Sequence, residues 1–444
     1  MRDLLLSYYG DDFTGSTDVM EALSSHGVSV VLFTRLPTDD EFRPFAHYSA
    51  IGLAGSSRSR SPAWMDEHLA PALLWLKHLG ARHCHYKVCS TFDSSPTTGS
   101  IGKAADIGRA VFGQRIVPLV VGVPQLKRYT VFGHLYASYR GAVHRIDRHP
   151  VMSRHPVTPM AESDLRLHLG AQTASQVGLV GLDVLTRSTV NILVDEIIAE
   201  TDGVVLFDVC DEATQLATGR QLLRTVAKIG PYVVGSSGVE YALLRALVVE
   251  GTINGTAAFA PVPRVDRAIA LSGSVSPTTE RQIRHALVHG FDGIATDPIA
   301  LTTDRNAEID RILAAAIACL EGGRCPLIHS ALGPTTDQGA ALEALPGARQ
   351  QIGEALGLIA RNLMERCGVR RVSFAGGDTS SHALSQLDVF ALTTRYPLTA
   401  TPGSPLCTAH SVNPALNGFD LAMKGGQVGD DDYFVKLRDG IASG

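Results

Sequence analysis

The sequence has no excess of basic residues and no long hydrophobic run. Its 39 Lys and Arg residues stand against 44 Asp and Glu residues, a net charge of −5, whereas nucleic-acid-binding domains carry basic patches. We therefore expect no nucleic-acid partner. No run of about 18 apolar residues is present to cross a membrane, and Met1-Arg2-Asp3 passes into a predicted strand without the layout of a signal peptide. These features predict a cytoplasmic protein without a membrane partner.

The sequence also lacks the common cysteine and nucleotide motifs. The seven cysteines are scattered and include no Cys-x-x-Cys pair, which argues against a disulfide framework and a zinc site. A P-loop is absent, because Thr97 stands where its first glycine is needed and Ala104 follows Lys103. No Gly-x-Gly-x-x-Gly loop follows a predicted strand, which argues against a rival dehydrogenase or epimerase that uses a nicotinamide dinucleotide.

What the chain does contain is an alternation of short β-branched runs and amphipathic segments, which predicts an α/β fold with mainly parallel sheets. Residues 251–264 have linker composition, with Gly251, Gly255, Pro261 and Pro263 and no periodicity. The alternation then restarts. We therefore predict two α/β domains, residues 1–255 and 256–444, with 251–264 as a candidate hinge.

The predicted elements are as follows. In the first domain we expect strands at 4–9, 28–34, 50–54, 83–88, 115–123, 178–182, 203–209 and 231–234, a hairpin arm at 129–136, and helices after residue 16 and at 62–79, 161–172, 190–199 and 237–249. In the second domain we expect strands at 267–271, 293–296, 325–329, 369–374 and 419–423, and helices at 278–288, 307–320, 348–367 and after residue 381.

The first predicted strand ends in the turn Gly10-Asp11-Asp12-Phe13-Thr14-Gly15. Open α/β sheets bind their ligands at the carboxyl ends of strands, so Asp11 and Asp12 are candidate site residues. These carboxylates could accept hydroxyl protons, coordinate magnesium, or be solvated turn residues. We expect Thr14 or Ser16 to cap the following helix.

Other polar groups of the first domain also fall at predicted strand ends. Arg58 follows one strand and could grip a carboxylate with two hydrogen bonds. Lys87 leads into Cys89-Ser90-Thr91-Phe92-Asp93-Ser94, and Arg128 precedes Gly133 and His134. Taken one at a time, each of these groups is typical of a surface loop. Taken together, they suit a small, anionic, hydroxylated substrate.

Three small-residue turns follow strands of the second domain. Each supplies backbone N–H groups or hydroxyls at a helix start or in a glycine loop, as phosphate binding requires. Lysine is scarce, seven in all, so phosphate charge would be offset by N–H groups, arginine and magnesium. The turns are Ser272-Gly273-Ser274-Val275-Ser276, Gly376-Gly377-Asp378-Thr379-Ser380 and Lys424-Gly425-Gly426-Gln427-Val428-Gly429.

Seven segments in this order resemble the four-carbon acid sugar kinases nearly end to end. They are Gly10 to Gly15, Lys87 with Cys89 to Ser94, Gly133-His134-Leu135-Tyr136, His155-Pro156-Val157-Thr158-Pro159-Met160, Ser272 to Ser276, Gly376 to Ser380, and Lys424-Gly425-Gly426. The resemblance implies an ATP-dependent kinase with an N-terminal substrate domain, a C-terminal nucleotide domain and an active site in the cleft between them.

The resemblance also implies residue roles. Asp12 would take the proton of the sugar's terminal hydroxyl or position that hydroxyl, and ATP and Mg²⁺ would be the cofactors. The acid sugar would face Asp11, Asp12, Arg58, Lys87, Ser90, Thr91 and Arg128. ATP would be held by Ser274 or Ser276, by Gly376, Gly377, Asp378 and Thr379, and by Gly426 or Gly429.

The motifs limit the acid sugars that could be the substrate without selecting one. The segment Cys89 to Ser94 is more similar to the 3-oxo-tetronate kinases than to the threonate or erythronate kinases, whose version usually carries Asp-Ser-Thr and an arginine. Gly10 and Asp378 depart from the family's usual alanine and glutamate, so a branched acid sugar such as 3-oxo-isoapionate stays open. The rival of another class is a non-catalytic sugar-acid-binding protein. Metal ligands are unassigned, and a homo-oligomer is left open.

Overall fold

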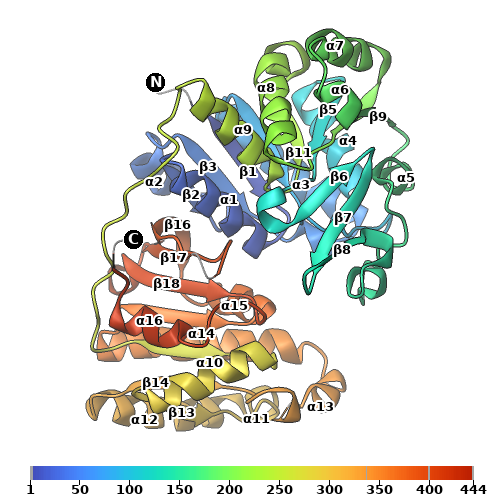
Figure 1. Ribbon diagram of the computed structural model, residues 1–444. Coiled ribbons are helices and arrows are strands. Elements are labelled where there is room, and N and C mark those ends of the chain that lie inside the picture. The colour runs from blue at the N-terminus through green and yellow to red at the C-terminus, as the bar shows by residue number, and fades with distance from the viewer. Residues whose placement is uncertain (1–3, 337, 399–400, 443–444) are drawn as a thin grey trace. The chain divides into compact units, whose positions relative to one another are not determined.

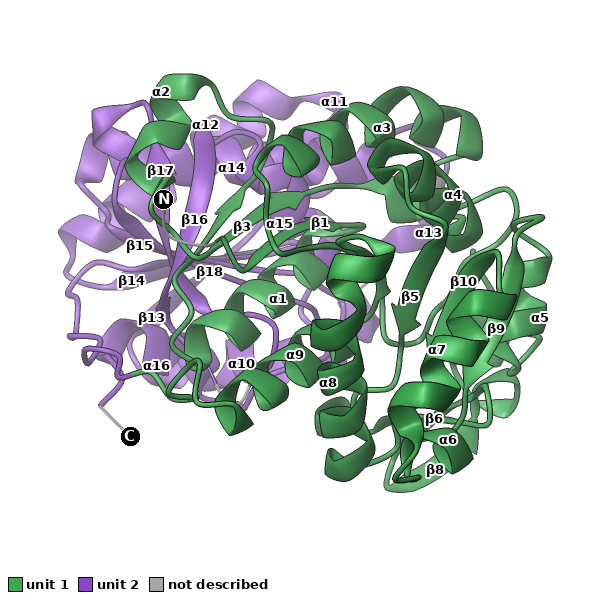
Figure 2. Cartoon of the chain, turned by 90° about the horizontal axis from the view of Figure 1, so that it is seen from above, with its two compact units in different colours: residues 1–257 green, residues 258–444 purple. Residues whose placement is uncertain are grey.

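The structure is a computed structural model that describes residues 4–336, 338–398 and 401–442. The chain folds as two compact units, residues 1–257 and 258–444 (Figures 1 and 2). The division falls within the stretch 251–264, which has linker composition.

Unit 1 is built on a parallel sheet. Among the described residues its strand order is β2-β3-β1-β4-β11-β5-β10-β9, and its pairings are parallel. The central strands are buried on both faces, which is why they read as near-continuous apolar runs. The strands are β1 Leu6–Gly10, β2 Val30–Phe33, β3 Ala50–Ala54, β4 His83–Lys87, β5 Ile116–Val120, β9 Gln176–Val180, β10 Gly203–Phe207 and β11 Tyr232–Gly235.

Helices cover both faces of this sheet. Helices α1, α9 and α8 pack side by side, and α3 packs with α4 on the opposite face (Figure 2). A separate antiparallel sheet, β6 Arg128–Val131, β7 His134–Tyr139 and β8 Ala142–Arg145, forms the hairpin arm. The helices are α1 Phe13–Ser25, α2 Asp39–Phe42, α3 Pro62–His78, α4 Ile101–Phe112, α5 Leu165–Gly170, α6 Leu182–Leu185, α7 Val190–Glu200, α8 Glu212–Ile229 and α9 Gly238–Val249.

Unit 2 has a mixed sheet in the order β13-β14-β12-β15-β18-β17-β16. The first five strands are parallel, and β17 pairs antiparallel with both β18 and β16. The strands are β12 Ile269–Ser272, β13 Phe291–Ala295, β14 Cys325–His329, β15 Arg371–Ala375, β16 Val389–Tyr396, β17 Leu406–Ser411 and β18 Phe419–Lys424.

The helices of unit 2 also form two layers. Helix α14 packs with α11, α12 and α15, whereas α10 packs with α16 on the other face of the sheet (Figure 2). They are α10 Pro277–Val288, α11 Ala300–Thr303, α12 Arg305–Glu321, α13 Gly339–Glu343, α14 Ala348–Cys367, α15 Gly377–Leu384 and α16 Tyr433–Asp439. The predicted class, two α/β domains with mainly parallel sheets, is confirmed.

Some local predictions were wrong. Helix α1 begins at Phe13, so Thr14 and Ser16 lie inside it and the Asp12 side chain is its cap, accepting a hydrogen bond from the Gly15 N–H. The helix predicted at 161–172 is shorter, Leu165–Gly170, because Asp164 caps it. Helices α4 and α8 and strands β16 and β17 were among the elements that were not predicted.

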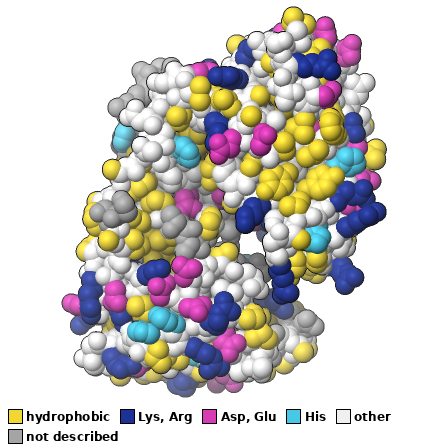
Figure 3. Space-filling view, viewed as in Figure 1, with side chains coloured by type: hydrophobic (Ala, Val, Ile, Leu, Met, Phe, Trp, Pro, Cys, Tyr) yellow, Lys and Arg dark blue, Asp and Glu magenta, His cyan; other side chains and the backbone are white. Residues whose placement is uncertain are grey.

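Charged side chains of both signs are spread over the face that Figure 3 shows, on both units, as expected for a small net charge. Among the described helices, none is long and apolar enough to span a bilayer.

Candidate active site

The first set of candidate residues lies at one edge of the unit 1 sheet. Strand β1 pairs with β3 on one side and with β4 on the other, with Gly10 opposite both Ala54 and Lys87. Because parallel strands end at the same edge, the turns after β1, β3 and β4 lie next to one another. This places Asp12, Arg58 and Asp93 within hydrogen-bond reach.

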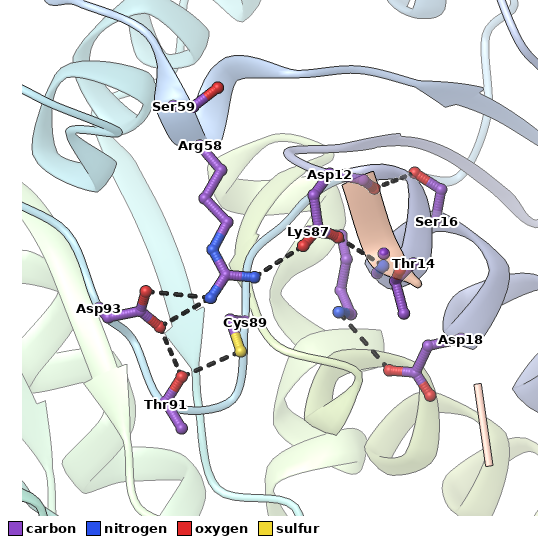
Figure 4. Close-up of polar contacts among 12 residues, drawn as sticks. Asp12, Thr14, Ser16, Asp18, Arg58, Ser59, Lys87, Cys89, Thr91 and Asp93 are labelled. Atoms are coloured by element: carbon purple, nitrogen blue, oxygen red, sulfur yellow. Dashed lines mark hydrogen bonds and ion pairs between the residues drawn. The ribbon is translucent and has the colours of Figure 1, made fainter. Parts of the chain in front are cut away.

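Arg58 lies between two carboxylates (Figure 4). Its Nη1 donates to Asp12 Oδ2 at 2.6 Å, and its Nη2 donates to both carboxylate oxygens of Asp93 at 3.0 Å. The Asp12 Oδ1 accepts from the Gly15 N–H at 2.5 Å. These two donors, one on each carboxylate oxygen, fix the orientation of the Asp12 side chain.

Asp93 is the buried member of this group and holds Arg58 in place. Its side chain is 1% exposed, against 30% for Arg58. The Thr91 hydroxyl donates to Asp93 Oδ1 at 2.5 Å, and the Thr158 hydroxyl donates to Oδ2 at 3.1 Å. Arg58 is therefore fixed by a buried carboxylate whose lone pairs are satisfied, and its two terminal nitrogens are already paired with protein carboxylates.

Lys87 and Asp11 lie behind this group. The buried Lys87 Nζ pairs with Asp18 of α1 at 3.5 Å (Figure 4). Although burial by itself lowers the pKa of Lys87, the carboxylates of Asp18, Asp12 and Asp11 raise it above its ordinary value. Burial, and then the nearby Asp12 carboxylate, raise the pKa of Asp11 to about 8. Asp11 is therefore a neutral acid at pH 7.

Gly15 is needed for this packing. A Cβ at this position would lie 2.7 Å from Asp12 Oδ1 and 3.1 Å from Lys87 Nζ. The helix start, the ammonium and the carboxylate can approach one another only without a side chain here.

The remaining predicted substrate residues are less directly connected. Arg128 and Arg58 both lie near Cys89, and Arg128 Nη1 donates to the carbonyls of Leu126 and Lys127. The Arg128 Nε is buried without a partner among the described residues. Ser90 is half-buried beside Cys89.

The second set of candidates lines a pocket in unit 2 of about 400 Å³. Turns that follow five parallel strands contribute to it, those after β12, β13, β14, β15 and β18. Its lining includes Ser274, Ser276, Gly376, Gly377, Thr379 and Gly426 of the predicted set, together with Gly273, Val275, Pro298, Ser330, Ala331, Gln338, Gly339, Leu342, Arg349, Ile352 and Gln427.

Two glycines shape this pocket. Gly376 has φ +120°, a conformation that strains other residues. A Cβ on Gly426 would lie 2.5 Å from Ser274 Oγ. Glycine is therefore favoured at 376 by its backbone conformation and at 426 by the close approach of Ser274.

Two predicted nucleotide residues are not placed in this lining. Gly429 is not among the lining residues, and a Cβ there would face Thr401 and Gln282 at 2.9 and 3.0 Å. The side chain of Asp378 lies outside what the structure describes.

Other functional candidates were missed or underrated. Asp93 was noted but not selected, and Asp18, Ser330 and Arg349 were not considered. Ser330 follows the predicted strand 325–329, so the strand-end rule used for the other turns would have found it. No sequence signal pairs Asp18 with Lys87, because that contact depends on how α1 packs on the sheet.

Two family models match the chain, one within each unit. Residues 6–243 match the family model of a sugar-binding N-terminal domain, and residues 269–434 match that of a nucleotide-binding C-terminal domain.

The chain also aligns with full-length relatives. It is 43% identical to the 3-oxo-isoapionate kinase of Paraburkholderia graminis, with 99% of this chain and 95% of the relative covered. It is 30% identical to the 3-oxo-tetronate kinase of Methylobacterium radiotolerans, with 99% and 100% covered. A crystal structure of a Haemophilus influenzae protein is similar at a TM-score of 0.74 and 25% identity, covering 97% of this chain and 99% of that one.

Proposed function

The chain belongs to the four-carbon acid sugar kinase family, and on this premise we propose that it transfers the γ-phosphoryl group of ATP to the terminal hydroxyl of a 3-oxo acid sugar. Unit 1 binds the acid sugar and unit 2 binds ATP. The relative at 43% identity favours the branched acid 3-oxo-isoapionate as acceptor. The second candidate is 3-oxo-tetronate, supported by relatives at lower identity.

The observation that carries the proposal is the Arg58 group at the sheet edge of unit 1. The Asp12 carboxylate is fixed by Arg58 and by the Gly15 N–H. Each carboxylate oxygen has a further lone pair, so Asp12 accepts the hydrogen bond of the sugar's hydroxyl and orients it toward the phosphorus atom. Phosphoryl transfer needs positioning more than strong base catalysis, so a carboxylate that is fixed in place suffices.

The guanidinium of Arg128 gives this region its preference for an anion, because Arg58 is already paired with Asp12 and Asp93. Arg58 and Arg128 both lie near Cys89, and Arg128 Nε has no partner among the described residues. We assign the sugar's carboxylate to this region, where the Arg128 guanidinium can donate hydrogen bonds to it.

The pocket of unit 2 suits the nucleotide. The hydroxyls of Ser274, Ser276 and Thr379 and the glycine turns supply donors for phosphate oxygens. The side chains of Leu342 and Ile352 supply apolar surface for the base.

Magnesium fits this site only as a partner of the nucleotide. Among the described residues, no group of three His, Cys, Asp or Glu side chains could hold a metal ion. Mg²⁺ commonly binds proteins through substrate phosphates, water and one or two carboxylates, so the hydroxyl-lined pocket is compatible with Mg²⁺ carried by ATP. When bound, the ion offsets phosphate charge during transfer.

The test is a coupled ADP-release assay of the purified chain with Mg·ATP and a panel of 3-oxo-isoapionate, 3-oxo-tetronate, threonate and erythronate. We expect ADP release that depends on a 3-oxo acid sugar, with the phosphate on its terminal hydroxyl by ³¹P NMR. Calorimetric binding of an acid sugar with no ADP release would instead support the non-catalytic binding protein.

A further inference from the structure

Lys424, at the end of β18, is a buried ammonium group without a counter-ion. Its side chain is 2% exposed. The Nζ donates to Thr279 Oγ1 and to the Gly425 carbonyl, both at 3.1 Å, and lies 5.6 Å from the centre of the Tyr433 ring. No carboxylate pairs with it among the side chains that the structure describes, and burial lowers the pKa of Lys424 to about 8. Lys87, equally buried, has Asp18 as its partner. Buried charges in folded proteins are normally paired, so Lys424 lacks an anion.

The same contacts fix the orientation of the glycine loop. Thr279 Oγ1 accepts from Lys424 and donates its own hydrogen to the Gly426 carbonyl at 2.9 Å. Lys424 and Thr279 therefore hold two consecutive carbonyls, those of Gly425 and Gly426. In a trans peptide the C=O of one residue and the N–H of the next point in opposite directions. The N–H groups of Gly426 and Gln427 must consequently point away from Lys424 and Thr279.

These two N–H groups belong to residues of the nucleotide pocket. Gly426 and Gln427 both line it, and neither N–H donates to another residue in the described part of the chain. Successive backbone N–H groups that point to one side bind anions. Ser274 Oγ lies against the same loop, since a Cβ on Gly426 would meet it at 2.5 Å, and it adds a hydroxyl donor at this point.

We infer that Lys424 and Thr279 form a clamp behind the glycine loop that presents the Gly426 and Gln427 N–H groups to a nucleotide phosphate, and that this phosphate is the counter-ion of Lys424. The inference rests on the proposed function, because it takes the unit 2 pocket to be the nucleotide site. Lys424 is a positioning residue: it acts through the loop and through its charge. The clamp therefore contributes to affinity for phosphate groups and not to affinity for the nucleoside.

The test compares ADP with adenosine as ligands in calorimetric titrations of the full chain. We expect Lys424→Met to raise the Kd for ADP about 20-fold or more and to change that for adenosine less than about threefold. Lys424→Arg, which keeps the charge, should recover part of the loss, and Thr279→Val should weaken ADP about fivefold. Lys436→Met is the matched control, because Lys436 is an exposed lysine of the same unit that pairs with Asp432, and both affinities should stay unchanged.

Each outcome is decisive. If Lys424→Met binds ADP within threefold of wild type, or loses ADP and adenosine equally, the clamp is refuted. Should Lys424→Met fail to fold, Thr279→Val decides by the same comparison. Failure of the folded wild-type chain to bind ADP at all would overturn the proposed function instead, and with it the premise of the clamp.

Discussion

Breaking the Arg58–Asp93 pair should destabilise unit 1 by a predictable amount. Asp93 is 1% exposed and Arg58 is 30% exposed, and two N–O contacts of 3.0 Å join them. Removing one partner of a fully buried pair costs about 3–5 kcal/mol, and exposed pairs are worth about 0.2–1 kcal/mol. Because Arg58 is partly solvated, we expect Arg58→Met to lower the free energy of unfolding by about 2–3 kcal/mol.

Unit 1 can be measured selectively in the intact chain. Both tryptophans of the protein, Trp64 and Trp75, lie in α3, so their fluorescence during urea denaturation reports this unit. The double-mutant cycle with Asp93→Asn isolates the pair. We expect Arg58→Met to cost about 1.5 kcal/mol less in the Asp93→Asn background, because the buried charge left unpaired is then absent.

The control is Arg43→Met, which breaks the exposed Arg43–Asp40 pair, 75% and 84% exposed. It should change stability by less than about 0.5 kcal/mol. A coupling between Arg58 and Asp93 no larger than the change in this control would refute the reasoning that Asp93 anchors Arg58.

Three further predictions concern single residues. Asp12→Asn keeps the cap of α1, because Asn caps a helix as well as Asp does. It should nevertheless lower turnover more than about tenfold in the ADP-release assay, and unchanged turnover would rule out the proposed role of Asp12 in orienting the sugar's hydroxyl. Because the pKa of Asp11 is raised to about 8, the folded chain keeps a proton between about pH 4 and pH 8 that the unfolded chain has lost, so stability of unit 1 falls as pH rises through this window. Asp11→Asn removes this contribution, and the wild type should lose about 3 kcal/mol more than the variant between pH 5.5 and pH 8 in urea unfolding. Parallel losses would contradict this reasoning. Gly376→Ala places a side chain at φ +120°, which costs about 1–3 kcal/mol of backbone strain, and it should weaken ADP binding about tenfold by calorimetry. The control is Gly323→Ala at an exposed position, where the added Cβ meets no atom within 4 Å, and it should leave ADP binding unchanged.

The strand ends were predictable from the sequence because one rule covers them. In a parallel sheet buried on both faces, strands are apolar runs and the polar residues that follow them gather at one edge. That rule placed Asp12, Arg58, Gly376 and Gly426 after strand ends without any knowledge of strand order.

Helix α8 was not predictable by the same means. Its buried face carries polar side chains, among them Thr214, Gln215, Thr218 and Gln221, so large apolar residues, by which a helix is usually recognised, occupy few of its buried positions. The capping box of Asp211 and Thr214 was the available signal. The antiparallel strands β16 and β17 were missed because they break the alternation of strand and helix.

Within the site, pairings were harder to predict than positions. Arg58 was expected to grip a substrate carboxylate, but its terminal N–H groups bond Asp12 and Asp93. The carboxylate with which a guanidinium pairs depends on the order of β3, β1 and β4 in the sheet, and the local sequence does not determine that order.

The Arg58 group ties together three separate loops, those after β1, β3 and β4, through one planar cation. Loops that would otherwise fluctuate independently lose that freedom when the chain folds, before any sugar arrives. The entropy cost of ordering these loops is therefore part of folding and does not oppose the binding of an acid sugar. Selection of the acid sugar then depends on the shape and charge of this surface and not on loop closure.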